Sequence, residues 1–127
     1  MAAQDTEFSE IAQIAVNVHD LERATGFYRD VLELPLVLQA PGLAFFRCGS
    51  VRLMLSPAEK AEYDHPASVL YYRVGDIERA HQRLVAKVRF ESPPHRVHRD
   101  ARHELWLAFF RDSEGNPLAL FSERPVN

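Results

Sequence analysis

The sequence predicts an α+β fold made of two tandem modules, each with a strand, an amphipathic helix and further strands. The first observation is an internal repeat, because residues 18–24 (VHDLERA) reappear 56 residues later at 74–80 (VGDIERA). The second is that residues 43–47 (LAFFR) reappear identically at 107–111, 64 residues later. Two matches in the same order predict two copies of one supersecondary unit.

In the first copy, residues 11–18 alternate loosely and are rich in β-branched side chains, which predicts a strand. Asp20 is a favourable helix N-cap, and Pro35 ends the helix that follows it. The apolar residues of that helix recur at helical spacing: Leu21, Ala24, Phe27, Tyr28, Val31 and Leu32. Residues 43–47 and 51–55 then flank Cys48-Gly49-Ser50 and predict a hairpin.

The second copy repeats this plan, with a strand at 69–74, a cap at Asp76 and a closing hairpin from 105–111 and 117–121. We therefore expect one domain, residues 1–127, in which module one covers about 11–56 and module two about 68–123. Residues 57–67, with two prolines among charges, are the expected linker.

Composition excludes several classes of protein. The 127 residues are 46% hydrophobic and 26% charged, with a net charge of -3 and no basic stripe, which argues against a nucleic-acid or anionic-membrane partner. No secretory signal or membrane span is recognisable. The single cysteine, Cys48, fits a reducing compartment, so we expect a cytoplasmic protein.

Residues 13–24 (QIAVNVHDLERA), followed by 27–32 (FYRDVL), resemble the opening of a glyoxalase or bleomycin-resistance domain. Residues 111–120 (RDSEGNPLAL) resemble the closing DPDGN turn and strand of the same family, with Ser113 and Glu114 in place of Pro and Asp. The sequence thus resembles the vicinal oxygen chelate superfamily of glyoxalases, bleomycin resistance proteins and dioxygenases over almost its whole length. The resemblance implies two βαβββ modules whose curved mixed sheets surround a cleft.

In that family four side chains commonly hold a divalent metal, on the first and last strand of each module. Carried over to this sequence, the four positions are Gln13, Leu53 (or Met54 if the register slips by one), Val69 and Ala119. Only Gln13 offers a ligating oxygen, and hydrocarbon side chains cannot replace the His, Glu or Asp that such ions prefer. We therefore expect no metal at these positions and no other cofactor.

Side chains alternate along a strand, so the positions of Gln13 and Ala119 predict which neighbours line the cleft. The resulting wall is mainly apolar and aromatic, which is typical of a small-molecule pocket. The alternative is that its phenylalanines only fill a core. The predicted ligand-binding residues are Gln13, Asn17, Phe45, Leu53, Tyr71, Leu107, Phe109, Ala119 and Phe121.

His95, His98 and His103 form a second group, with Asp100 and Glu104 among them. Their spacing on an extended segment does not place all three on one side, and nearby prolines and arginines favour an exposed loop. His103 is the exception, because alternation along 103–109 puts it on the cleft face, where it could exchange a proton. His103 and Tyr71 are accordingly the candidate catalytic residues.

Three functions remain open. The sequence favours a binding protein that holds a small aromatic or planar molecule in an apolar cleft with the metal ligands lost. The alternative is a lyase, isomerase or dioxygenase with an atypical metal site near His95, His98 and His103, and a third is a metal-free enzyme using Gln13, Tyr71 and His103. Fold analogy does not decide among them. A homodimer is expected on family grounds and because two-fold pairs are the commonest assembly.

Overall fold

The computed structural model describes residues 7–58, 60–65 and 68–126. The chain divides into two compact units, Met1–His65 (unit one) and Pro66–Asn127 (unit two). In unit one the elements are β1 (Gln13–Asn17), α1 (Leu21–Gly26), the π-helix η2 (Phe27–Val31), β2 (Leu36–Ala40), β3 (Leu43–Cys48), β4 (Val51–Ser56) and the 3₁₀ turn η3 (Ala61–Tyr63). In unit two they are β5 (Leu70–Arg73), α2 (Ile77–Leu84), β6 (His95–Arg99), β7 (His103–Arg111) and β8 (Pro117–Pro125).

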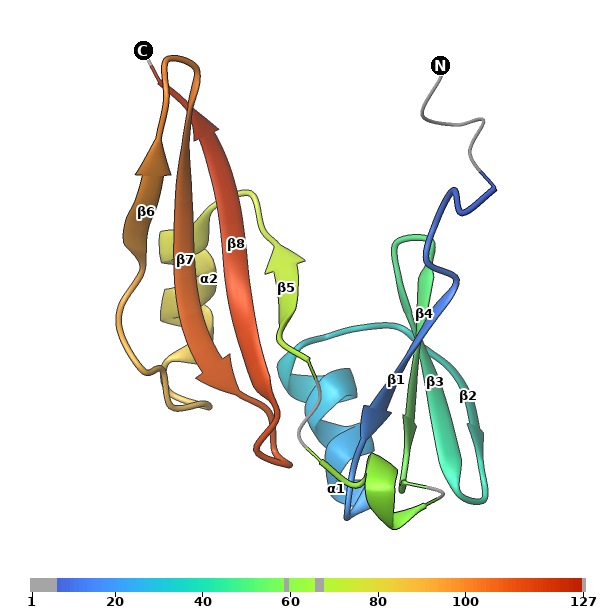
Figure 1. The fold of residues 1–127 in the computed structure, drawn as a ribbon. Helices are drawn as coiled ribbons and strands as arrows, with labels where there is room; N and C mark the ends of the chain where they lie inside the picture. The colour runs from blue at the N-terminus through green and yellow to red at the C-terminus, as the bar shows by residue number, and fades with distance from the viewer. Residues whose placement is uncertain (1–6, 59, 66–67, 127) are drawn as a thin grey trace. The chain divides into compact units, whose positions relative to one another are not determined.

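Each unit is a βαβββ module with a four-stranded mixed sheet (Figure 1). The strand orders are β1-β4-β3-β2 and β5-β8-β7-β6, so the first strand of each unit pairs in parallel with the last one. The repeated LAFFR segments lie on β3 and β7, which hold the same place in the two orders. This confirms the α+β fold of tandem modules predicted from the repeat.

The two helices begin at equivalent caps. The side chain of Asp20 accepts a hydrogen bond from the backbone N–H of Arg23, and that of Asp76 accepts one from Arg79. Such a bond satisfies one of the free N–H groups of the first helical turn. Helix α1 continues directly into the π-helical turn η2, whereas the sequence predicted a single regular helix.

One face of each sheet packs against its helix, α1 on β3 and β4, and α2 on β7 and β8 (Figure 1). The side chains between helix and sheet form the core of each unit, with Tyr28 and Phe46 buried in unit one and Ile77 and Phe110 in unit two. In the described residues, the opposite side of each sheet is the one that does not pack against α1 or α2. We call it the helix-free face.

The register of the first hairpin corrects one prediction. Gly49 and Ser50 alone form the turn, so Cys48 pairs with Val51, Arg47 with Arg52 and Phe45 with Met54. Leu53 and Leu55 therefore point to α1 and are buried, at 2% and 0% exposure, so neither lies on the helix-free face with Gln13. Met54 takes the position that the sequence had assigned to Leu53.

Residues 95–99 were expected to be a solvated loop, but they form the edge strand β6. All five are exposed, as expected for the loop, yet they pair with β7. A register shift between Arg96 and His98 places both His95 and His98 opposite leucines of the helix-free face. The bulge at Val97 explains why simple alternation failed here.

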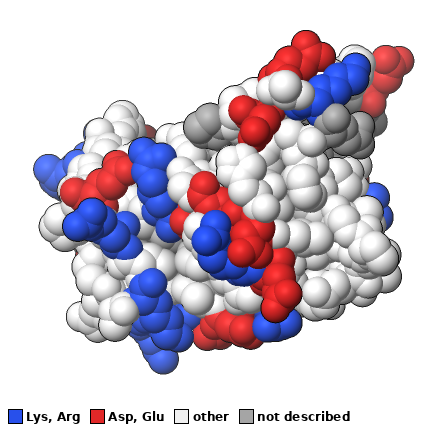
Figure 2. Space-filling model, turned by 90° about the horizontal axis from the view of Figure 1, so that it is seen from below, with Lys and Arg blue, Asp and Glu red and all other residues white. Residues whose placement is uncertain are grey.

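Acidic and basic residues lie next to one another on the face drawn in Figure 2. Within the described ranges, none of the helices is both long and apolar enough to cross a membrane.

Candidate functional site

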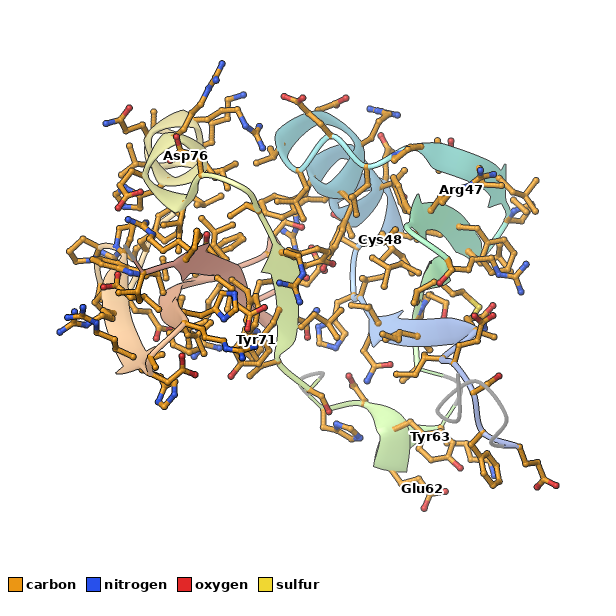
Figure 3. All side chains as sticks on the ribbon, turned by 90° about the horizontal axis from the view of Figure 1, so that it is seen from above. Arg47, Cys48, Glu62, Tyr63, Tyr71 and Asp76 are labelled. Atoms are coloured by element: carbon orange, nitrogen blue, oxygen red, sulfur yellow. The ribbon has the colours of Figure 1, made fainter. Side chains whose placement is uncertain are left out.

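Three aromatic rings meet on the helix-free face of unit two. The ring of Tyr71, on β5 and labelled in Figure 3, packs edge to face against Phe109 at a centroid distance of 6.0 Å and against Phe121 at 6.4 Å. Edge-to-face pairs at such distances are favourable contacts between rings. We call Tyr71, Phe109 and Phe121 the aromatic face.

Two small or branched residues form the floor of the aromatic face. Ala119 pairs with Tyr71 on one side and with Phe109 on the other, so it lies between their rings. Ala119 is fully buried, whereas Tyr71 is 51% exposed. Leu107, opposite Phe121, is 9% exposed. The sequence placed all five residues on one face, and the register agrees.

A charged group borders the aromatic face. The Arg73 guanidinium carbon lies 4.8 Å from the Phe121 ring centroid, and its Nη1 donates to Glu123 Oε1 at 2.7 Å. The cation therefore interacts with the ring face while its charge is balanced by a carboxylate. A ligand bound on this face would therefore lie beside an arginine whose charge is balanced by Glu123.

Unit one also carries an aromatic residue on its helix-free face. Phe45 lies under Arg52, whose guanidinium carbon is 4.2 Å from the ring centroid. Arg52 Nε donates to Gln13 Oε1 at 2.7 Å, and Gln13 Nε2 lies 3.9 Å from Met54 Sδ. Gln13 and Phe45 thus share the face predicted for them, but Arg52 holds the amide oxygen of Gln13.

Asn17 lies on the same face of β1, and its side-chain amide donates to backbone carbonyls. Asn17 Nδ2 donates to the Tyr63 carbonyl oxygen and, at 2.9 Å, to that of His65. Nearby, His19 Nε2 lies 2.6 Å from Asp64 Oδ1. These contacts attach Tyr63, the last residue of η3 and labelled in Figure 3, and the two residues after it to the end of β1.

The two candidate catalytic residues lie far apart. Tyr71 is in the row of Phe109, whereas His103 begins β7, six residues earlier on that strand. A strand rises about 3.4 Å per residue, so the two rows are separated by about 20 Å. His103 and Tyr71 thus lie at separate places along the sheet of unit two.

The three histidines share the helix-free face of the β6–β7 hairpin, contrary to the expectation from their spacing. His95 pairs with Leu107 and His98 with Leu105, and His103 has the same alternation as these leucines. Their ring contacts diverge, since His95 Nδ1 lies 3.1 Å from the Pro93 carbonyl oxygen and His98 Nε2 3.7 Å from Asp100. Among the described residues, no group of three His, Cys, Asp or Glu side chains could hold a metal ion.

Two carboxylates of this hairpin have altered acidity. Backbone hydrogen bonds from His103 and Arg102 lower the pKa of Asp100. The Trp106 indole, which donates to Glu104 Oε1 at 2.9 Å, lowers the pKa of Glu104, and Arg96 adds to the effect. Both carboxylates are thus stabilised as anions.

In unit one, burial raises the pKa of the Cys48 thiol, which makes that thiol a poorer nucleophile.

The four metal-ligand positions implied by the family resemblance do not fit a metal. In unit one they are Gln13 and Met54, whose amide oxygen accepts from a guanidinium and whose thioether is a soft ligand. In unit two they are Val69 and Ala119, which offer only hydrocarbon. Divalent cations prefer carboxylate ligands or, for ions such as Zn²⁺ and Ni²⁺, imidazole, and an adjacent guanidinium repels all of them.

Arg52 is the residue of this face that was not predicted from the sequence, whereas Met54 was expected only as the alternative to Leu53 if the register slips by one. A three-residue turn at Cys48-Gly49-Ser50, as expected from the sequence, would pair Phe45 with Leu53. A two-residue turn at Gly49-Ser50 pairs Arg47 with Arg52 instead. Two-residue loops are the commonest hairpin connection and contain glycine at positions of positive φ, as Gly49 has here at 60°.

The fold and its paired sheets agree with a sequence comparison. A family model described as the glyoxalase/bleomycin resistance protein/dioxygenase superfamily matches residues 10–120. The chain therefore belongs to this superfamily. No curated protein matches the sequence.

Solved structures with the same fold include proteins of different kinds. A lactoylglutathione lyase from Agrobacterium tumefaciens is 28% identical, with a TM-score of 0.72 over 90% of this chain and 93% of that one. A glyoxalase/bleomycin resistance protein/dioxygenase from Nocardioides is 25% identical, with a TM-score of 0.68 over 89% and 82%. TnmS3, an antibiotic binding protein from Streptomyces sp. CB03234, is 20% identical, with a TM-score of 0.75 over 94% and 99%, and shows the shared fold.

Proposed function

We propose that this protein binds a planar aromatic small molecule on the aromatic face of unit two and does so without a resident metal ion. The observation that carries the proposal is the group of Tyr71, Phe109 and Phe121, whose rings contact one another on the helix-free face. In unit one, Gln13 and Phe45, with Met54 in place of Leu53, form a separate candidate ligand surface on the helix-free face of that unit.

The energetics of the aromatic face favour a ligand. Tyr71 is half exposed, and Phe109 and Phe121 are partly exposed, so each ring still has surface that a ligand could cover. Burying a large apolar side chain contributes about 1.5–3 kcal/mol. A flat aromatic molecule would remove water from several of these rings at once, and ring-to-ring geometry adds to the gain.

Binding is favoured over catalysis by the placement of the titratable groups. Ala119 and Phe109 share the row of Tyr71, and the carboxylate next to Phe109, that of Glu91, is ion-paired with Arg111. His103 is about 20 Å away along β7. The superfamily fold serves a lactoylglutathione lyase and an antibiotic binding protein alike. Because a fold does not determine chemistry, the arrangement of these side chains supports the choice.

Fluorescence titration with N-phenyl-1-naphthylamine, an uncharged aromatic probe, tests the proposal. We expect saturable binding by the wild-type protein and an affinity about tenfold lower for Phe109→Ala, because that variant loses one wall of the face. Phe109→Leu keeps apolar volume and guards against loss of fold, so it should bind with intermediate affinity.

Phe8→Ala is the matched control, because Phe8 is a highly exposed phenylalanine outside both sheets. Its affinity should equal that of the wild type. Equal affinities for Phe109→Ala and wild type, with both proteins folded by circular dichroism, would exclude the aromatic face as the binding site.

The proposal includes a homodimer. On the edge strand β2, Val37 and Leu38 are 51% and 50% exposed. An exposed apolar edge strand is a template for pairing with a second chain, and two-fold pairs are the commonest assembly. The molecular mass of the protein in solution tests the homodimer, for which we expect twice the mass of one chain.

A further inference from the structure

His95 of β6 borders the aromatic face within unit two. In the sheet of that unit, β7 lies between β6 and β8 (Figure 1). Across these strands His95 is opposite Leu107, and Leu107 is opposite Phe121. Residues directly opposite one another in antiparallel strands have their side chains on the same face of the sheet. The imidazole of His95 therefore belongs to the face that carries the Phe121 ring.

Leu107 lies between the two rings of this row. Leu107 is 9% exposed, whereas Phe121 is partly exposed and His95 is exposed. Neighbouring strands are about 4.8 Å apart, so the backbones at His95 and Phe121 are separated by about 10 Å. A flat two-ring molecule that covers Leu107 and contacts Phe121 therefore has one end beside the His95 imidazole.

The contacts of His95 determine which ring nitrogen carries the proton. Nδ1 lies 3.1 Å from the Pro93 carbonyl oxygen, and Ser92 Oγ is 3.5 Å from the same nitrogen. A carbonyl oxygen only accepts hydrogen bonds, so Nδ1 is the protonated nitrogen and donates to Pro93. In the neutral ring Nε2 is then unprotonated and acts as a hydrogen-bond acceptor.

Nε2 of His95 is available to a ligand. Within the described ranges, no hydrogen bond or ion pair engages this nitrogen. His98, on the same strand, differs because its Nε2 lies 3.7 Å from Asp100 Oδ2. His98 is opposite Leu105, so it lies one row further along the sheet than Phe121. Strand β6 thus presents one imidazole beside a carboxylate and one whose acceptor is unused.

The carboxylates near the rings already have cationic partners. Glu123 Oε1 accepts from Arg73 at 2.7 Å, and Glu91 Oε2 lies 3.3 Å from Arg111 Nε. A ligand that donated to either carboxylate would compete with a charge-assisted bond, which is stronger than a bond between neutral groups. Donation to His95 Nε2 disrupts no contact of this kind.

We propose that His95 is a ligand-binding residue of unit two and that the ligand of this protein is an aromatic molecule with a hydroxyl group at one end. The inference rests on the proposed function for the aromatic part of the ligand. The ring system lies on Leu107 against Phe121, and the hydroxyl donates to His95 Nε2. A ligand of the same shape without the hydroxyl covers Nε2 and leaves it without a donor, so the site selects against it.

Two ligands with the same ring system test the hydroxyl contact. 2-Naphthol has the hydroxyl, and 2-methoxynaphthalene has a methyl group in place of the hydroxyl hydrogen. We expect isothermal titration calorimetry of the wild-type protein to show about threefold to tenfold tighter binding of 2-naphthol, as one net hydrogen bond contributes. In His95→Phe, which keeps a flat ring and removes the acceptor, the two affinities should differ less than twofold.

His98→Phe is the matched control, because it makes the same change on the same strand and face but in the next row. It should keep the wild-type ratio of the two affinities. His95→Gln places an amide oxygen near the position of Nε2, so its ratio should lie between those of wild type and His95→Phe. Thermal melts establish that each variant is folded.

Nitrogen-15 NMR of the histidine side chains gives a measurement that does not depend on affinity. In mildly alkaline buffer, the ligand-free protein should show His95 as the Nδ1–H tautomer, as the bond to Pro93 requires. Addition of 2-naphthol should shift the Nε2 resonance of His95 and leave that of His98 in place. An Nε2–H tautomer of His95 would contradict the contact.

The outcomes separate this inference from the proposed function. If Phe109→Ala weakens both ligands but wild type and His95→Phe have the same ratio, the hydroxyl contact is wrong and the aromatic face stands. If binding of 2-naphthol depends on His95 and not on Phe109, the hydroxyl contact stands and the aromatic face is wrong. An equal loss of the ratio in His98→Phe, or binding of neither ligand, overturns the hydroxyl contact.

Discussion

Asp112 organises the turn between β7 and β8 through three hydrogen bonds. Its Oδ1 accepts from the backbone N–H groups of Glu114 and Asn116, both at 2.8 Å, and its Oδ2 accepts from the Asn116 side chain at 3.0 Å. Asp112 and Asn116 are buried at 6% and 3% exposure. Gly115 supplies the positive φ, 84°, that the turn requires. This explains why the turn tolerates Ser113 and Glu114 in place of the family's Pro and Asp.

Asp112→Ala should therefore destabilise the protein by about 2 kcal/mol or more. The substitution leaves buried N–H groups without acceptors, and hydrogen bonds to a charged group contribute about 1.5–3 kcal/mol. Urea denaturation measures the change. Ser113→Ala, in the same turn, is the control and should lie within about 0.5 kcal/mol of wild type. A similar small effect for Asp112→Ala would show that the turn does not depend on this carboxylate.

At the scale of elements, the β6–β7 hairpin is held by Glu104. This carboxylate accepts from the Trp106 indole and lies 3.4 Å from Arg96 Nη1 and 3.8 Å from Arg99 Nε. Trp106 itself faces α2, where Arg124 lies over its ring and donates to Glu78. Glu104 thus connects the edge strand to the strand that packs against the helix.

The pKa of Glu104 predicts how the stability of this hairpin depends on pH. The folded-state pKa lies below the ordinary value of 4.5, so the contribution is fully present above pH 4.5 and is lost as the pH falls through the folded pKa. The difference in urea midpoint between wild type and Glu104→Gln should accordingly be constant near neutral pH and shrink below pH 4.5.

Trp106 is the only tryptophan, so its fluorescence reports the same titration. Glu104→Gln should abolish the acid-induced change in emission. A stability difference that grows as the pH falls would mean that the folded-state pKa is raised, contrary to the hydrogen bond from Trp106.

The sequence predicted the order of these elements, but it did not always predict which face of a strand a side chain occupies. That face depends on turn lengths and bulges in the backbone, which alternation does not reveal. The repeated motifs and helix caps predicted the order of strands and helices, because such signals are local. The faces of β7 and β8 were predicted from Ala119 and confirmed by their register. The faces of β4 and β6 were not, since a one-residue change in a turn or a bulge moves every following side chain to the other face.

For the whole molecule, duplication produced two units with the same topology and different chemistry. Tyr71 in unit two occupies the place of Ala15 in unit one, opposite Ala119 and Met54 respectively. Large rings therefore gather on one sheet, and arginines with no ion-pair partner among the described residues lie on the other. The face of the rings could be predicted from alternation along their strands. The face of Arg52 could not, because it depends on the number of residues in the turn before β4.

Thermal denaturation with added divalent metal tests the absence of a metal site in the protein as a whole. A ligand that binds only the folded state at 100 times its dissociation constant stabilises it by about 2.7 kcal/mol, which raises Tm by several degrees in a domain of this size. With Mn²⁺, Ni²⁺ or Zn²⁺ at about 100 μM, we expect a change in Tm below about 1 °C relative to EDTA. The reason is chemical: Gln13 is bonded to Arg52, Met54 is a thioether, and Val69 and Ala119 are hydrocarbon.

Within the described residues, the β6–β7 hairpin carries three histidines, His95, His98 and His103, and the same titration tests whether an added metal acts there. His95 and His98 lie beside different leucines of β7, so their rings do not converge with His103. His103→Ala should consequently have the same Tm as wild type at every metal concentration. A metal-dependent rise of several degrees that His103→Ala abolishes would place a metal on β6 and β7. A rise that instead requires Gln13 would show that a cation can displace Arg52, and it would restore metal chemistry as a candidate function.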